Sequence, residues 1–277
     1  MNNPFDRTRL TTKYRLMVIS AKGGVGKSTI TVNLAAALAA RGLKLGIFDA
    51  DVHGPNIPAL LGITQTRNVR MNNPDAMVPI EARPDSMDMR PIQPVTRYGM
   101  KVMSLGLLVG QQQTVNPEPQ IMGQMVTFLL SRVDWGDVDI LLLDMPPGTG
   151  EPLGTIIEHG LVDGVLMVAV REQLAHLDNG RLLSFLKRSR VRVLGIVENM
   201  THIICPRCGE LIELYPSPVA EQTVYGDSPV LSAIPFDPTL IRQVRGGPPL
   251  PLAEPESPVA ATLLALADRI IELKDRK

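Results

Sequence analysis

The chain has 277 residues, enough to bury one substantial core, and an open α/β sheet of this length commonly forms a single domain. It has 28 Lys and Arg and 28 Asp and Glu residues, so no net field draws it to nucleic acid or to an anionic membrane, and we expect neither as a partner. The first 14 residues contain no apolar signal-peptide core, and no apolar run reaches the roughly eighteen residues that span a bilayer, which predicts a cytoplasmic protein.

Short apolar runs of strand length alternate with helical stretches along the chain. The first run covers residues 14–20, and a helix-forming stretch extends from Ser28 to Arg41 after a glycine-rich loop. Further strands are expected at residues 43–48, 138–144, 164–170 and 191–197. Because these runs are nearly continuous in apolar residues, they predict a mostly parallel sheet with helices on both faces, in a three-layer, doubly wound α/β fold.

The remaining segments are expected to belong to the same domain. Residues 1–13 are predicted as a flexible tail, and residues 257–277 as an amphipathic helix that docks on the sheet. Residues 63–120, rich in Pro, Asn, Met and Gln, are predicted as an irregular excursion with one strand candidate at residues 100–108 and room for a hairpin. Since no internal repeat or long linker divides the chain, residues 1–277 are expected to form one domain.

The glycine-rich loop reads Lys-Gly-Gly-Val-Gly-Lys-Ser-Thr at residues 22–29. Its backbone N–H groups and the start of the next helix can cradle β- and γ-phosphate oxygens, so the pattern predicts an ATP-binding phosphate loop (P-loop). Lys27 is placed as the charge on those oxygens, Ser28 as a Mg²⁺ ligand and Thr29 near the α-phosphate. The expected nucleotide-binding residues of the loop are Gly23, Gly24, Val25, Gly26, Lys27, Ser28 and Thr29. Ala21 stands where the general pattern has glycine, and Lys22 adds a second lysine.

Acidic residues stand at the ends of two buried strands. Asp51 is expected to orient or deprotonate the attacking water, and Asp49 to hold a magnesium-bound water. Asp144 occupies the Walker B position, where its carboxylate can reach the Mg²⁺ shell, and the amide of Gly148 is expected to contact the γ-phosphate. The alternatives are that the first two aspartates cap the next helix, and that the proline-rich segment after Asp144 merely ends a strand.

Cys205 and Cys208 are the two cysteines of the chain, in a Cys-Pro-Arg-Cys segment. Their spacing is too tight for a structural disulfide and is typical of metal or redox chemistry in a reducing compartment. A zinc site completed by two chains, with His202 as a further nitrogen donor, is one interpretation, and a dithiol redox pair is another.

Six motifs occur in a fixed order: KGGVGKST, DADVHGPN, DMPPGTG, VENM at residues 197–200, CPRCG at 205–209 and IPFDP at 234–238. Together they closely resemble the Mrp/ApbC family of iron-sulfur cluster carrier ATPases, relatives of MinD, ParA and the nitrogenase iron protein. The resemblance implies a weak, Mg²⁺-dependent ATPase that receives a cluster from donor proteins and transfers it to apo iron-sulfur proteins.

The resemblance also implies roles for particular residues. Lys22 would cross a homodimer interface to the partner's nucleotide, and Cys205 and Cys208 would hold a 4Fe-4S cluster shared between two subunits. Since such a cluster usually takes four thiolates, twofold symmetry is the simplest way for a chain with two cysteines to supply them. The residues implied around adenine are Asn199, Pro235 and Asp237.

A second class of function, a MinD- or ParA-like spatial regulator that binds membrane or DNA, has limited support. It rests on the basic stretch at residues 181–192 and on the C-terminal helix. Basic residues also favour the C-terminal end of a helix, which is the simpler interpretation of that stretch.

Overall fold

The structure is a computed structural model, and it describes residues 12–51, 54–63, 91–107, 119–172, 175–205, 207–215, 225–242 and 247–276. The strands of the main sheet are β1 Tyr14–Ile19, β2 Leu45–Asp49, β3 Val95–Arg97, β4 Met100–Ser104, β5 Ile140–Asp144, β6 Gly164–Ala169, β7 Val193–Glu198 and β10 Val230–Ala233. A separate hairpin consists of β8 His202–Ile204 and β9 Leu211–Glu213. The helices are α1 Lys27–Ala40, α2 Ile57–Leu60, α3 Pro119–Arg132, α4 Leu153–Glu158, α5 Ala175–Arg188, α7 Pro238–Arg242, α8 Leu250–Ala253 and α9 Pro258–Asp275.

The main sheet has the strand order β10-β7-β6-β1-β5-β2-β4-β3. Its neighbouring strands are parallel except for β3 and β4, which form an antiparallel hairpin at one edge. β1 lies between β5 and β6; strands β2 to β5 lie on one side of it, and β6, β7 and β10 lie on the other. In open α/β sheets, ligands bind at the carboxyl ends of the strands where the order reverses, so β1 ends at the expected place for a site.

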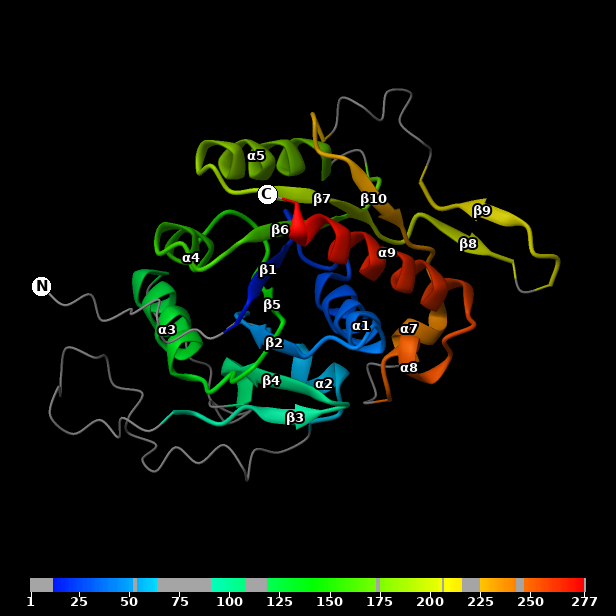
Figure 1. Cartoon of the computed structure of the whole chain (residues 1–277). Helices are drawn as coiled ribbons and strands as arrows, with labels where there is room; N and C mark the ends of the chain where they lie inside the picture. The colour runs from blue at the N-terminus through cyan, green and yellow to red at the C-terminus, as the bar shows by residue number, and fades with distance from the viewer. Residues whose placement is uncertain are drawn as a thin grey trace, which may run out of the picture.

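Helices cover both faces of the sheet, as Figure 1 shows. α1, α2, α8 and α9 share one apolar core with the sheet, and α3, α4 and α5 share the other. α1 is apolar on nearly all sides, and such a helix is stable only when it is enclosed. It packs between the sheet and α9, whose Leu263, Leu266 and Ile270 are buried. The predicted three-layer α/β fold is confirmed.

The strand predictions agree with the structure to within a few residues. The predicted strand at residues 43–48 is β2, and the candidate at residues 100–108 is β4 followed by a short 3₁₀ turn at Leu105–Leu107. The C-terminal helix is present as α9. Of the predicted excursion, residues 64–90 and 108–118 lie outside the described residues.

The predicted N-terminal tail differs from the structure at its last two residues. Residues 1–11 lie outside the described ranges, but Thr12 is buried and the backbone N–H of Lys13 donates to the Val138 carbonyl at 3.1 Å. Thr12 and Lys13 are therefore part of the folded domain at the amino-terminal ends of the strands, because hydrogen bonding to the segment that leads into β5 begins before β1.

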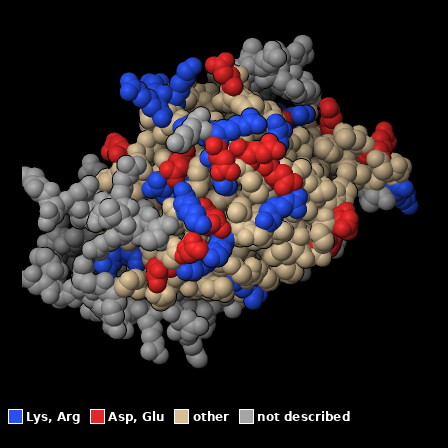
Figure 2. Space-filling model, in the orientation of Figure 1, with Lys and Arg blue, Asp and Glu red and all other residues tan. Residues whose placement is uncertain are grey.

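The surface in Figure 2 carries Lys and Arg side chains intermixed with Asp and Glu. Several of them form exposed pairs, such as Arg41 with Asp268 at 2.6 Å. In the described part of the chain, no helix is both long and apolar enough to cross a membrane.

Trp135 is the residue whose substitution tests how much the apolar core beneath α3 contributes to stability. Its side chain is 1% exposed, packs edge-on against Phe48 with ring centroids 6.3 Å apart, and donates from Nε1 to the Leu130 carbonyl at 3.2 Å. We expect Trp135→Ala to lower the free energy of unfolding in a denaturant titration by about 3–5 kcal/mol, because a large cavity opens. Leu177→Ala, at a side chain 73% exposed, should change it by less than about 0.5 kcal/mol; an equal loss in both variants would contradict this account.

Candidate functional site

The loop between β1 and α1 needs glycine for its shape. Gly24 and Gly26 have backbone φ angles of +79° and +86°, which residues with a side chain rarely adopt. A Cβ at Gly26 would lie 2.3 Å from Nδ2 of Asn199, so a larger residue could not fit without displacing that side chain. Gly26 is also the N-cap of α1, and no side chain caps this helix end. The first N–H groups of α1 can therefore bind phosphate oxygens, as the sequence predicted.

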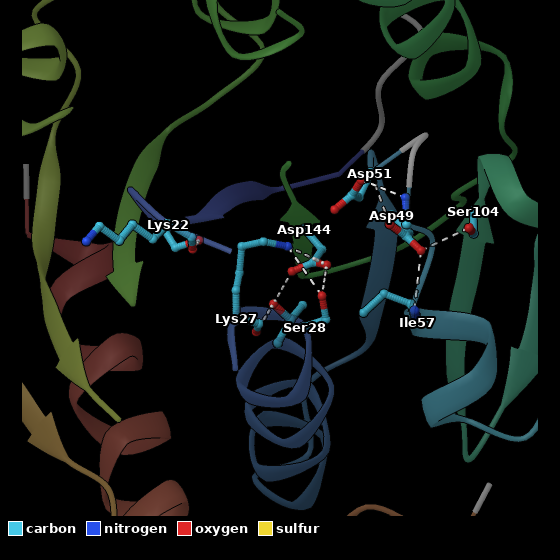
Figure 3. Close-up of polar contacts among 11 residues, drawn as sticks. Lys22, Lys27, Ser28, Asp49, Asp51, Ile57, Ser104 and Asp144 are labelled. Atoms are coloured by element: carbon cyan, nitrogen blue, oxygen red, sulfur yellow. Dashed lines mark hydrogen bonds and ion pairs between the residues drawn. The ribbon is translucent and has the colours of Figure 1, made fainter. Parts of the chain in front are cut away.

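Lys27, Ser28 and Asp144 meet at the end of this loop, as Figure 3 shows. Nζ of Lys27 lies 2.8 Å from Oδ2 of Asp144, and the two side chains are 7% and 0% exposed. Ser28 Oγ donates to the same oxygen at 2.6 Å, and Thr31 Oγ1 donates to Oδ1 at 2.7 Å. Each carboxylate oxygen of Asp144 thus has partners, as a buried charge requires. The Lys27 ammonium and the Ser28 hydroxyl thus lie side by side, 3.3 Å apart, at the start of α1, where the sequence predicts phosphate and Mg²⁺.

Asp49 and Asp51 follow β2 beside this cluster. Asp49 Oδ2 accepts from Ser104 Oγ at 3.0 Å and from the backbone N–H of Ile57 at 3.3 Å, and Oδ1 accepts from the Asp51 amide at 3.1 Å. Asp51 Oδ1 accepts from the Gly54 amide at 3.0 Å. Ile57 is the first residue of α2, so Asp49 has the helix-capping contact that was the alternative to a role at magnesium. The two roles use the same edge of the sheet and do not exclude each other.

The carboxyl group of Asp49 is protonated more readily than an ordinary carboxyl group. Burial, followed by the nearby charge of Asp144, raises the pKa of Asp49 to about 8. The hydrogen bonds from Ser104 and from the Asp51 amide oppose this shift without cancelling it. At neutral pH the Asp49 carboxyl group therefore keeps its proton, and a divalent cation would compete with that proton for Asp49.

Lys22 lies apart from the Lys27 cluster. Its side chain points away from Lys27 in Figure 3, and Nζ is 3.8 Å from Oδ2 of Asp178 on α5, with both side chains about a third exposed. The predicted γ-phosphate contact also has a partner inside the chain, because the Gly148 amide donates to the Ser20 carbonyl at 2.9 Å. Both groups would have to exchange these partners to reach a triphosphate.

The residues predicted around adenine lie on two adjacent segments. Asn199 is buried and its Nδ2 donates to the Val25 carbonyl at 2.9 Å, which supports the phosphate loop from behind. Pro235 is buried, and Asp237 Oδ1 accepts from the Thr239 amide and hydroxyl, both at 2.7 Å, which caps α7. The segments are joined where the Thr201 amide donates to the Ile234 carbonyl at 3.1 Å. Asn199 thus has a structural contact that the sequence did not indicate.

Cys205 and Cys208 lie in the turn of the β8–β9 hairpin. The Cys205 amide donates to the Glu210 carbonyl at 2.8 Å, and the Gly209 amide donates to the Cys205 carbonyl at 2.9 Å, with Gly209 at a φ of +75°. Hydrogen bonds from the backbone amides of Cys208 and Arg207 lower the pKa of the Cys205 thiol. Amide donors to sulfur stabilise the thiolate, which is the form that binds metal, so the turn fits a metal-ligand role.

The hairpin around the cysteines exposes an unusual number of apolar side chains. The exposed ones are Ile204, Leu211, Ile212 and Leu214. Ile204 and Leu211 are paired across the two strands and so lie on one face of the hairpin, and exposed apolar side chains that lie together often mark a surface that another molecule covers. The proposed nitrogen donor, His202, begins β8, and its Nδ1 lies 2.9 Å from Thr201 Oγ1. Within the described ranges, no group of three or more His, Cys, Asp or Glu side chains is arranged to hold a metal ion.

Three contacts at the site had not been expected from the sequence. Thr31 binds Asp144, Ser104 binds Asp49, and Asp178 faces Lys22. Thr31 lies one helical turn after Lys27, which is a signal that the sequence offered. Ser104 and Asp178 are brought in by β4 and α5, so only the tertiary fold identifies them.

The strand order, the phosphate loop and the Lys27–Asp144 cluster define a P-loop NTPase with a second lysine in its loop. The family described as "ParA: NUBPL iron-transfer P-loop NTPase" matches residues 11–271, so the chain belongs to this family. This agrees with the resemblance to Mrp/ApbC carriers.

Individual proteins support the same assignment. The iron-sulfur cluster carrier protein of Pyrococcus horikoshii is 34% identical over 268 residues, which cover 96% of this chain and 88% of the relative. A nucleotide-binding protein of Archaeoglobus fulgidus, solved in complex with ADP, has a TM-score of 0.66 and 32% identity over 85% of this chain and 86% of its own. The MinD protein of Pyrococcus horikoshii with Mg-ADP has a TM-score of 0.63 and 23% identity, covering 95% of this chain and 99% of its own, and shows the shared fold.

The raised pKa of Asp49 predicts how stability depends on pH. Between about pH 4 and pH 8 the unfolded chain gives up the Asp49 proton while the folded chain keeps it, so wild-type stability falls as the pH rises through this window. Asp49→Asn removes that loss. The variant should gain stability relative to wild type by on the order of 1 kcal/mol per pH unit across the window, measured by denaturant titrations at several pH values. A difference that is constant or shrinks with pH would rule out a protonated Asp49.

Proposed function

We propose that this chain binds and hydrolyses Mg-ATP as a homodimer in the cytoplasm, carries a 4Fe-4S cluster between its two subunits and transfers it to apoproteins. The observation that carries the proposal is the Cys205–Cys208 turn, whose backbone amides favour the thiolate and which follows closely, in the chain, on Asn199, a residue that contacts the phosphate loop. The name of the relative from Pyrococcus horikoshii supports the same cargo. Two unpaired cysteines also suit a reducing compartment.

The nucleotide would bind by replacing contacts within the Lys27 cluster. Lys27 would exchange the carboxylate of Asp144 for β- and γ-phosphate oxygens, and Ser28 Oγ and Asp144 would hold Mg²⁺ directly or through water. Asp49 would hold a magnesium-bound water after losing its proton, and Asp51 would orient the attacking water. The ADP complex of the relative from Archaeoglobus fulgidus supports nucleotide binding by this fold.

The position of Lys22 supports a two-subunit reaction. Its ammonium group points away from Lys27 of its own chain, so within one chain it makes no contact with the place of the γ-phosphate. An exposed ion pair such as Lys22–Asp178 is worth less than about 1 kcal/mol, so it is readily exchanged for a phosphate. Lys22 would then add positive charge to the partner's triphosphate as charge develops in the transition state.

The cluster is the cargo, and two hairpins would share it. Each chain supplies two thiolates, and a 4Fe-4S cluster takes four. The exposed apolar pair beside the cysteines, Ile204 and Leu211, could be covered by the same pair of the second subunit across the twofold axis. A cluster on that axis stays near the surface, which suits transfer to an apoprotein.

The two lysines are expected to differ in their effect on ATP hydrolysis. Lys27→Ala removes the charge on the β and γ oxygens and should lower turnover by about 100-fold or more. Lys22→Ala should leave nucleotide affinity of the isolated chain unchanged while lowering turnover, since the lysine acts across the interface. Phosphate release and calorimetric nucleotide binding measure the two quantities. Lys44→Ala, at a side chain 65% exposed, is the matched control and should match wild type; full activity in both loop variants would reject these assignments.

The cysteines are expected to determine the metal. After anaerobic reconstitution, wild-type protein should show visible absorption and about four irons per two chains, and should elute as a dimer. Cys205→Ser and Cys208→Ser should each lose the absorption and the iron. Wild-type protein alkylated with iodoacetamide beforehand is the control without substitution. Uptake of zinc alone, or a particle that stays monomeric with both Mg-ATP and iron and sulfide supplied, would refute the carrier function.

A further inference from the structure

Residues 199–204, here called the link, contact the phosphate loop at one end and lead directly into the cysteine turn at the other. The link starts directly after β7 and ends directly before Cys205. Its first two residues touch the phosphate loop and its last three are the strand β8. Neither the ion pairs of the site nor the cysteine chemistry described above gives it a role.

At the first end, the link is in contact with the two residues that shape the loop. Nδ2 of Asn199 donates to the Val25 carbonyl at 2.9 Å. A Cβ at Gly26 would lie 2.3 Å from that Nδ2 and 3.6 Å from Cε of Met200, so both side chains lie directly against Gly26. Phosphate binding engages the peptide groups of this part of the loop, so the link lies behind the groups that a nucleotide contacts.

At the other end, the link determines where the hairpin lies. The Thr201 carbonyl accepts from the Leu214 amide at 3.1 Å, and the His202 carbonyl accepts from the Phe236 amide at 2.8 Å. From Thr201 the chain runs extended through β8 to Cys205, a path of about 13 Å at the usual rise per residue of a strand. A displacement that includes Thr201 would therefore be passed to the cysteine turn, because an extended strand has no slack to absorb it.

Met200 is the position in the link where a displacement can arise. Its φ is +56°, in the left-handed region that costs backbone energy for any residue with a side chain. Its neighbours are held, since the Asn199 amide donates to the Ala169 carbonyl at 2.8 Å and the Thr201 amide to the Ile234 carbonyl at 3.1 Å. A strained residue between two held neighbours is a place where a change of one φ and ψ pair relieves strain.

We propose that the link transmits the state of the phosphate loop to the Cys205–Cys208 turn, with Met200 as its hinge and Asn199 as its contact on the loop. Nucleotide binding moves Val25 and Gly26, the hinge converts that movement into a displacement of β8, and the geometry of the two sulfur atoms changes. This inference deepens the proposed function, because it names the residues that would couple ATP binding to cluster binding.

The test measures the cysteines directly, on reduced protein without iron. The alkylation rates of Cys205 and Cys208 by iodoacetamide are followed by peptide mass spectrometry, with and without saturating Mg²⁺ and a non-hydrolysable ATP analogue. In wild type, the nucleotide should change the rate at Cys205 by about five-fold or more, the lower end of usual coupling between two sites. Met200→Gly removes both the side-chain contact with Gly26 and the strain. In this variant the alkylation rate of Cys205 should be nearly the same with and without the nucleotide.

Arg190→Gly is the matched control. Arg190 also has a left-handed φ, +55°, at the end of α5, so the substitution relieves the same kind of strain away from the link. It should keep the wild-type ratio of rates. Thr201→Val removes the hydroxyl that donates to the Ile234 carbonyl at 3.2 Å, and it should lower the ratio without touching the phosphate loop.

Two results would overturn the proposed role of the link. One is a Cys205 alkylation rate in wild type that is the same with and without bound nucleotide. The other is a Met200→Gly variant in which the ratio of these two rates equals that of wild type. A Met200→Gly protein that no longer binds the analogue in calorimetry would make Met200 part of the nucleotide site and would overturn its assignment as a hinge. Light scattering on the same samples measures whether the chains associate. If the Cys205 alkylation rate changes only when the chains associate, in wild type and in every variant, the assignment of Met200 as a hinge would also be overturned. Because no iron is present, failure of the link and failure of cluster binding are separate results.

Discussion

The buried pair between Lys27 and Asp144 is the interaction on which the nucleotide site depends. It joins the first residue of α1 to the last residue of β5, so it fixes the helix start against the sheet at the carboxyl ends of the strands. Removing one partner of such a pair leaves an uncompensated charge away from water, which costs several kcal/mol. Neither side chain can therefore leave unless a charge of the same sign as its lost partner arrives. A triphosphate and Mg²⁺ bring both, the first for the lysine and the second for the aspartate.

The proton on Asp49 follows from the same constraint. Lys27 and Asp144 already pair with each other beside Asp49, so a further ionised carboxylate would find no cation of its own. Asp49 instead satisfies its oxygens with Ser104, the Asp51 amide and the start of α2. Asp49 therefore adds no negative charge beside Asp144 until the pH rises through about 8 or a cation displaces its proton.

Much of the fold was predictable from the sequence because the central strands are enclosed on both faces. A strand such as β5 is apolar at nearly every position whatever its neighbours are, so residues 138–144 identified it. The order of the strands was not predictable, since β5 pairs with β1 and β2 across long stretches of chain. β8 and β9 have three residues each, too few to show a period.

The site divides in the same way. Lys27 and Ser28 follow from spacing within one strand-loop-helix unit, and Asp144 from its place at a strand end. The contact of Asn199 with Val25 joins residues 174 positions apart, so no local pattern indicates it. The capping role of Asp49 was foreseen as an alternative, and sequence could not decide the matter because one carboxylate can serve a helix end and a metal ion equally well.

The placement of the cysteine hairpin within the chain has a consequence for biosynthesis. A two-stranded ribbon of this length is not stable by itself in water, and its backbone is held by Ile234 and Phe236, which come later in the sequence. Both cysteines thus leave the ribosome before the segment that holds them in place. They reach their folded arrangement only after that segment has been translated, so a cluster bound there would be inserted into a nearly finished polypeptide rather than into a nascent one.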